Sequence, residues 1–123
     1  MNIHPIRIGP VLRELLLESD AIAQRVDGRI FPYTTKEKVA MPNIVYDGIS
    51  VDFEETKDGA EPMEVTVSLN VNTSDYMEGM ALAEEVLDVL LEHKSVSPIS
   101  ASCEYDNAAL MYTHTLTFKV YIE

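Results

Sequence analysis

The stretch MEVTVSLNVNTSDYMEGMALAEEVLDVLLEH, from Met63 to His93, decides the fold class, because a strand pattern passes directly into a helix pattern within it. From Glu64 to Thr73, apolar and polar residues alternate with the period of a β-strand. The residues predicted to face the core are Val65, Val67, Leu69 and Val71. A strand with one polar face is typical of an antiparallel sheet that has one side open to water or to a partner.

The second half of this stretch predicts the strongest helix of the chain, from Tyr76 to His93. Thr73 or Ser74 is expected to cap it, because a hydroxyl oxygen can accept a hydrogen bond from a free N–H of the first turn. The predicted apolar stripe consists of Met80, Ala83, Leu87, Leu90 and Leu91, and is widened by Leu82, Val86 and Val89. A helix with such a stripe covers one face of a sheet and supplies the second layer of the core.

A strand and a turn are predicted before this stretch. Ile44 to Phe53 alternates, and the set expected to face the core is Val45, Asp47, Ile49, Val51 and Phe53. The polar segment EETKDGAEP, residues 54–62, predicts a turn with Asp58-Gly59 near its middle, a dipeptide favoured in hairpins. The two strands are therefore expected to form an antiparallel hairpin.

A second hairpin is predicted after the helix. It consists of a weaker strand from Ile99 to Tyr105, a turn at residues 106–109 and a long strand from Met111 to Ile122. The face of the last strand expected to be apolar carries Tyr112, His114, Leu116, Phe118, Val120 and Ile122. Cys103 alternates with Ile99 and Ala101, so it is expected to be a small buried residue without a catalytic role.

Two helical segments are predicted near the start of the chain. Pro10 suits the first turn of a helix, and Val11, Leu12, Leu15 and Leu16 follow at helical spacing. Ser19 is expected to cap a short second helix from Ala21 to Val26, which Gly28 ends. The predicted fold is α+β in the order α-β-β-α-β-β: a four-stranded, mostly antiparallel sheet with two main helices on one face.

Composition and charge restrict the function. The length of 123 residues fits one domain, and no apolar run approaches the roughly 20 residues of a membrane span. The single Cys103 excludes an internal disulfide and fits a reducing cytoplasm. The net charge of −12 opposes specific nucleic-acid binding. Residues 1–46 hold six basic and five acidic residues, whereas residues 47–123 hold three and sixteen. This asymmetry is either a solvated face or a device by which one copy meets the next.

The sequence contains no pattern that predicts catalysis, a cofactor or a metal. His114 lies on a predicted core face, where a histidine is expected to be structural, and no carboxylate is placed by spacing to orient it. Paired carboxylates such as Glu54-Glu55 are expected to be solvated. The segment DFEETKDGAE lacks the spacing of an EF-hand loop. We therefore expect no enzyme, no cofactor and no metal.

The connector between the second helix and the Pro42-led strand is long for a small protein. It lies within VDGRIFPYTTKEKVAMPNIVYDGI, residues 26–49. Together with VLRELLLESDAIAQRVDGRIFPY, the strand–Ser74–helix stretch quoted first and the final YTHTLTFKVYIE, it resembles the tail-completion, or tail-terminator-like, proteins of long-tailed bacteriophages and prophages. The turn from Gly28 to Pro32 and the step from strand through Ser74 to helix are the most telling parts. The resemblance covers nearly the whole chain, as a single domain of residues 1–123.

The resemblance implies a structural protein without a reaction. Such subunits form a ring, often hexameric, at the head-proximal end of the tail tube, where the ring stops tube growth and meets the head connector. The implied partners are copies of the chain, the major tail tube protein and the head connector protein, in a virion tail assembled in the bacterial host cytoplasm. No membrane is implied.

A ring needs two different patches on each subunit. One predicted patch comprises Arg29, Phe31, Tyr33, Lys36 and Lys38 of the connector. The other comprises Glu54, Glu55, Asp58, Glu61 and Glu64 at the first hairpin. The alternative classes of protein are another head–tail connector or neck protein and a small soluble protein-binding adaptor. The alternative for the connecting segment of this chain is that it merely wraps the sheet edge.

Overall fold

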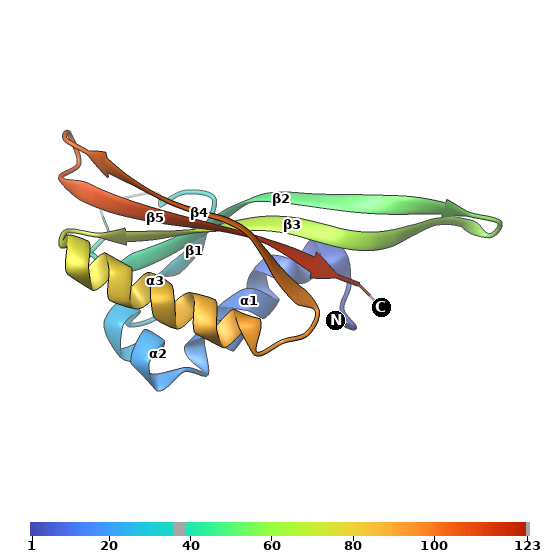
Figure 1. Ribbon diagram of the computed structural model, residues 1–123, viewed down its shortest axis with the longest axis horizontal. Coiled ribbons are helices and arrows are strands. Elements are labelled where there is room, and N and C mark those ends of the chain that lie inside the picture. Colours follow the sequence, from blue (N-terminus) through green and yellow to red (C-terminus); the bar gives the residue numbers. More distant parts are fainter. Residues whose placement is uncertain (36–38, 123) are drawn as a thin grey trace.

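All helices lie on one face of a five-stranded sheet in the computed structural model, which describes residues 1–35 and 39–122 (Figure 1). The sheet order is β1-β2-β3-β5-β4. The strands are β1 (Ile30–Pro32), β2 (Asn43–Thr56), β3 (Gly59–Thr73), β4 (Val96–Asp106) and β5 (Met111–Tyr121). The helices are the 3₁₀ turn η1 (Pro5–Arg7), α1 (Ile8–Leu17), α2 (Asp20–Val26) and α3 (Tyr76–Leu91). The α+β class is therefore confirmed.

The prediction of four strands was wrong, because the connector itself contributes one. The strand β1 pairs parallel with β2, with Ile30 opposite Ile44, whereas all other neighbours in the sheet are antiparallel. Three residues are too few to show the alternation of a strand, and proline is rare inside strands, so Pro32 argued against one here. Its position in the sheet depends on pairing with distant residues, which the local sequence does not reveal.

The central strand β3 has the predicted face. Val65, Val67, Leu69 and Val71 are fully buried and lie opposite the inward residues of β5, such as Phe118. They join residues of α1, α2 and α3 in one apolar core. Burying an apolar side chain of this size contributes about 1.5–3 kcal/mol, so this row accounts for much of the stability of the fold.

The predicted inward face of β2 was wrong in its first half, because a β-bulge inverts the alternation. Ile44 and Tyr46 belong to the core, and they lie opposite Val71 and Leu69. The register then shifts between Asp47 and Ser50, where Gly48 has a φ of 61°. An extra residue turns every later side chain to the other face. Ile49 and Val51 therefore pack against the core as predicted, while Phe53 is 60% exposed.

The first hairpin is longer than predicted. Residues 54–62 continue both strands instead of forming a broad turn, and only Lys57 and Asp58 connect β2 to β3. Gly59 follows with a φ of 119°, a conformation that side chains rarely adopt. The hairpin extends beyond the helices at one end of the molecule (Figure 1). Its outer half, residues 52–64, is called the arm below.

The helix α3 begins and faces differently from the prediction. Asp75 is its cap and accepts a hydrogen bond from the N–H of Glu78 at 2.9 Å, while Thr73 instead donates to the carbonyl oxygen of Asp75. The centre of its buried face is Leu82, Val86 and Leu90, and Leu91 is 44% exposed. The helix is apolar over more of its circumference than the core covers. A stripe with Met80 and Leu87 consequently lies beside β4 at the surface.

The predicted burial of Cys103 was wrong. β4 is an edge strand, and within it only Val96 is buried. The helices do not cover the outer half of this strand, so its alternation does not translate into burial. Cys103 is exposed.

The short helix α2 confirms its predicted cap. The hydroxyl oxygen of Ser19 accepts from the N–H of Ile22. The helix ends at Asp27 in the left-handed conformation, and Gly28 follows with a φ of 77°. α1 begins at Ile8, before the predicted Pro10, because the turn η1 leads directly into it.

Candidate assembly interface

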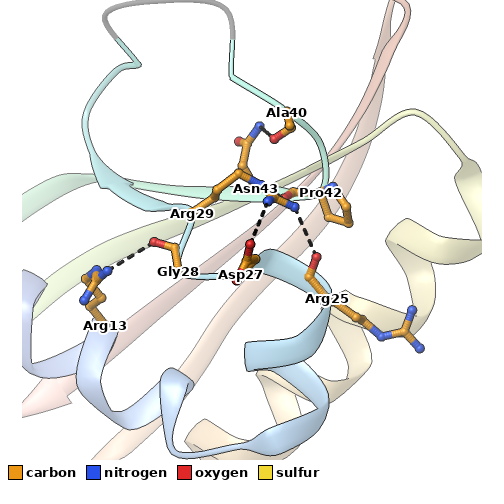
Figure 2. A network of polar contacts seen from close by, with 8 residues as sticks. All are labelled: Arg13, Arg25, Asp27, Gly28, Arg29, Ala40, Pro42 and Asn43. Atoms are coloured by element: carbon orange, nitrogen blue, oxygen red, sulfur yellow. Dashed lines mark hydrogen bonds and ion pairs between the residues drawn. The ribbon is translucent and has the colours of Figure 1, made fainter.

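Two arginines fix the ends of the connector (Figure 2). Arg29 donates through Nε to the carbonyl oxygen of Pro42 at 3.0 Å and through Nη2 to that of Arg25 at 3.4 Å. It therefore ties the last turn of α2 to the residue just before β2. The side-chain amide of Asn43 donates to the carbonyl oxygen of Ala40 at 3.3 Å and holds the same end.

Arg13 of α1 fixes the other end. Its Nη2 donates to the carbonyl oxygen of Gly28 at 3.1 Å, and its Nε to that of Ile30 at 3.3 Å. Arg13 was not singled out from the sequence, since an arginine on the polar side of an amphipathic helix usually faces water. Its role depends on the docking of α1 beside β1, which is a tertiary contact.

The predicted contact residues of the connector lie in different environments. Arg29 makes its described contacts inside the chain, including an ion pair with Asp27 at 3.9 Å. Phe31 is partly buried on β1, and Tyr33 is 57% exposed with a φ of 62°. The hydroxyl of Tyr33 accepts from the N–H of Ile49 at 3.4 Å, so its ring lies along β2. Lys36 and Lys38 lie outside the described residues.

The second predicted patch lies on the arm. Glu54, Glu55, Asp58 and Glu61 are all exposed, and residues 52–64 hold six acidic residues and one lysine. The arm also exposes apolar side chains that the sequence analysis did not assign to a contact. Phe53 and Met63 are 60% and 44% exposed, and Tyr121 of β5, beside the base of the arm, is 48% exposed. Exposed apolar groups beside a charged rim resemble the composition of protein interfaces.

The described part of the connector forms no hydrogen bond or ion pair with the arm in the same copy. The strand β2 begins at Asn43 beside the connector and ends at Thr56 beside the arm tip (Figure 1). A strand rises about 3.3 Å per residue, so the start of β2, where Arg29 bonds to Pro42, lies about 40 Å from the arm tip at Thr56. Tyr33 reaches further along β2, to Ile49, so only Arg29 and the arm tip are too far apart to touch within one copy.

The sheet face opposite the helices carries a ladder of hydrogen-bonded polar side chains. Thr113 donates to Asn72 at 2.8 Å, Thr115 donates to Asn70 at 2.8 Å, and the hydroxyls of Ser68 and Thr117 lie 3.0 Å apart. The ladder ends in the ion pair of Lys119 with Glu64 at 3.1 Å, whose hydrogen bond raises the pKa of the lysine. The alternation of β3 predicted that this face is open to water or covered by a partner. Its side chains form hydrogen bonds with one another, most of them are half-buried, and Asn72 at the connector end is buried.

A groove between α3 and β4 brings together a cysteine and a histidine, the side chains best suited to chemistry. Met80, Ala83 and Leu87 form one wall, and its floor is Ala101, Cys103, His114 and Leu116. The Sγ of Cys103 lies 3.9 Å from Nδ1 of His114, and burial lowers the pKa of that histidine. A thiol beside a base was not expected from the sequence. Within the described residues, however, no carboxylate bonds to His114 to orient it as a general base.

Two further observations concern other kinds of site. Among residues 1–35 and 39–122, no three His, Cys, Asp or Glu side chains are grouped so that they could hold a metal ion. None of the helices in the described part of the chain is long and apolar enough to cross a membrane.

The extended arm and the connector held by two arginines are the distinctive features of this small α+β fold. Residues 10–123 match the family model described as "Tail completion protein gp17". The chain belongs to this family of structural proteins of the phage tail, as the resemblance implied. A search of the curated proteins finds no match to the chain.

The fold also occurs in a solved virion. A chain of the structure titled "Virion of native gene transfer agent (GTA) particle" superposes with a TM-score of 0.74. The two chains are 17% identical, and the match covers 91% of each. At this identity the likeness establishes the fold.

Proposed function

We propose that this protein forms a ring at the head-proximal end of the tail tube, where it ends tube growth and helps to join the tail to the head. Membership of the tail completion family is the observation that carries this proposal. The partners in this proposal are further copies of the chain, as in a hexamer, the major tail tube protein and the head connector protein. Assembly takes place in the cytoplasm of the bacterial host of a phage or prophage.

The position of the two patches supports head-to-tail contacts. A ring requires that one patch of a subunit meets a different patch of the next. The connector lies beside the first half of β2, with Tyr33 exposed, and the arm contains its second half, with Phe53 exposed. The two segments differ in charge by sequence. Buried apolar area supplies the affinity in this arrangement, at roughly 25 cal/mol per Å² before association costs. The acidic arm sets the register and the rate of encounter.

The role at the end of the tube is tested in a phage or prophage that carries the gene. Deletion of the gene should give tails longer than normal without joined heads, which electron microscopy measures directly. Tails of normal length that merely fail to join heads would instead indicate a head–tail connector or neck protein. Normal virions would contradict both roles.

The ring contacts are tested with the purified protein. Glu54, Glu55 and Glu61 are replaced together by Lys, and sedimentation velocity and native mass spectrometry are recorded at low and at 0.5 M salt, where screening length falls to about 4 Å. The variant should assemble less than the native chain, mainly at low salt. The control replaces Glu14 of α1 and Glu18, which directly follows α1, by Lys, which changes the net charge without changing the arm. If the triple variant and the control variant both sediment like the native chain when the tube protein is present, the arm is not a subunit contact.

A further inference from the structure

The two edges of the sheet differ in their capacity to bind another strand. At the β1 edge, each outward backbone group is used within the chain. The N–H of Ile30 donates to the carbonyl oxygen of Gly28 at 2.9 Å, and its carbonyl oxygen accepts from Arg13. Pro32 has no N–H, and its carbonyl oxygen accepts from the N–H of Thr34 at 2.7 Å. This edge is closed.

The β4 edge is open along its outer half. The N–H of Tyr121 donates to the carbonyl oxygen of Ser95, which fixes the alternation of ladder bonds along β5. Counted from that bond, Thr113 and Thr115 bond to β4, so their partners Glu104 and Ser102 point inward. The backbone groups of Ala101, Cys103 and Tyr105 consequently point away from the sheet.

Two of these three residues line the groove, and Tyr105 lies on the same side of the sheet. Ala101 and Cys103 lie opposite Leu116 and His114 on the helix side of the sheet, and both line the groove. Tyr105 stacks on Tyr112 with ring centroids 4.6 Å apart. A strand added to this edge would form about six backbone hydrogen bonds. Its side chains opposite Ala101 and Cys103 would enter the groove.

We propose that β4 binds an extended segment of a different protein, with alternating apolar residues and basic flanks, by strand addition. The charge around the groove supports basic flanks. Glu84 lies on its α3 rim and Asp88 is exposed one turn further along α3, while Glu104 and Asp106 are exposed on β4 itself and point to the other face of the same edge. The apolar residues of the segment pack against the α3 wall.

A second copy of the chain fits this edge poorly. Its β1 edge is closed by Arg13, and its free strands are β4, which has the same carboxylates Glu84 and Asp88 beside it, and the acidic arm of residues 52–64. The carboxylates around the groove repel both. Strand addition also needs only one copy, so this inference goes beyond ring formation and does not depend on it.

The test uses the full chain and an acetylated, amidated peptide Lys-Thr-Val-Thr-Val-Thr-Lys, followed by amide NMR. The peptide should shift the amides of Ala101, Cys103 and Tyr105 and the side chains of Met80 and Leu87. A peptide N-methylated at alternate residues should lose the shifts, and one with Glu at both ends should bind about tenfold more weakly at low salt. Shifts confined to the arm or to the polar ladder, or none at millimolar peptide, would overturn the proposal.

Two variants complete the test. A101P removes an outward N–H that the sheet does not use, and L87E places a charge at the groove wall; each should weaken the lysine peptide about tenfold. Circular dichroism checks that each variant is folded, and S100A on the opposite face serves as the control. Self-association of the native chain that A101P abolishes would identify a second copy as the occupant and overturn the proposal. Ring assembly is read separately by sedimentation, so failure of one proposal does not obscure the other.

Discussion

The buried amide of Asn72 donates to the side-chain oxygen of Asn43 at 2.9 Å and so links the ends of β3 and β2. Asn43 in turn holds Ala40 of the connector, and Thr113 of β5 donates to the other side of Asn72. The side chain of Asn72 on β3 thus joins β3 to β2 and β5, and through Asn43 it is also linked to the connector. This relay makes the shape of the connector depend on the sheet.

Replacement of Asn72 by Ala should destabilise the protein and loosen the connector. It leaves the oxygen of Asn43 and the hydroxyl of Thr113 without their partner, at a cost of about 1–3 kcal/mol in the free energy of unfolding. Urea denaturation measures this loss. The control is T66A on the same face of β3, where less than half of the loss is expected. Equal losses of stability in the two variants would show that the hydrogen bonds of Asn72 contribute nothing beyond the effect of alanine on the strand.

Replacement of Arg29 by Met should increase hydrogen exchange in the connector. The guanidinium holds the carbonyl oxygens of Arg25 and Pro42 at once, and a lysine, with a single ammonium group, should restore little. The expected loss is about 1–3 kcal/mol, measured by denaturation, with faster exchange at the amides of Tyr33 and Thr34. The exposed Arg7 provides the matched control, R7M. Protection unchanged in R29M would mean that other contacts hold the connector.

Replacement of Gly79 by Ala should destabilise the protein although alanine favours helices. A Cβ at this position would lie 2.6 Å from Oγ1 of Thr73 and 2.9 Å from the ring of His114. Overpacking of this kind costs about 1–3 kcal/mol, which exceeds the gain of about 1 kcal/mol in helix propensity. Thermal denaturation gives the sign. A higher melting temperature would show that α3 shifts to accommodate the methyl group.

Stability should fall on mild acidification because of His114. Burial lowers the pKa of its imidazole below the ordinary 6.5, so the unfolded chain takes up a proton before the folded chain does. The free energy of unfolding contributed by this group is complete above pH 6.5 and falls as the pH drops below that value. Tyr76, Glu84 and Cys103 line the same groove. In the H114Q variant, the difference in the free energy of unfolding between pH 7.5 and pH 5.5 should be smaller than in the native chain. An unchanged difference would mean that other groups cause it.

The sequence predicts well the strands that lie between two other strands and the features that depend on adjacent residues alone. The alternation of β3 and β5 and the cap at Ser19 are local patterns, and the structure confirms them. Gly48 shows the limit. Its bulge inverts the faces of β2, and nothing within the strand distinguishes a bulging glycine from an ordinary one. Cys103 shows another, since the burial of an edge strand depends on how far a helix reaches.

The candidate interface was accessible from the sequence only in part. The acidic residues of the arm are exposed as their polarity predicted, but the length of the arm was not evident because EETKDGAEP has the composition of a loop. The roles of Arg13 and Arg29 were hidden, because their partners are backbone carbonyl oxygens, which carry no sequence signal.

The guanidinium of Arg13 against β1 has a consequence for behaviour at high concentration. The closed β1 edge and the acidic arm both oppose endless stacking of the sheets, and β4 can join β4 at most once, in a closed two-fold pair. A subunit produced in excess before its assembly site exists is thereby protected from forming fibres, and an R13A chain should be the one that gels.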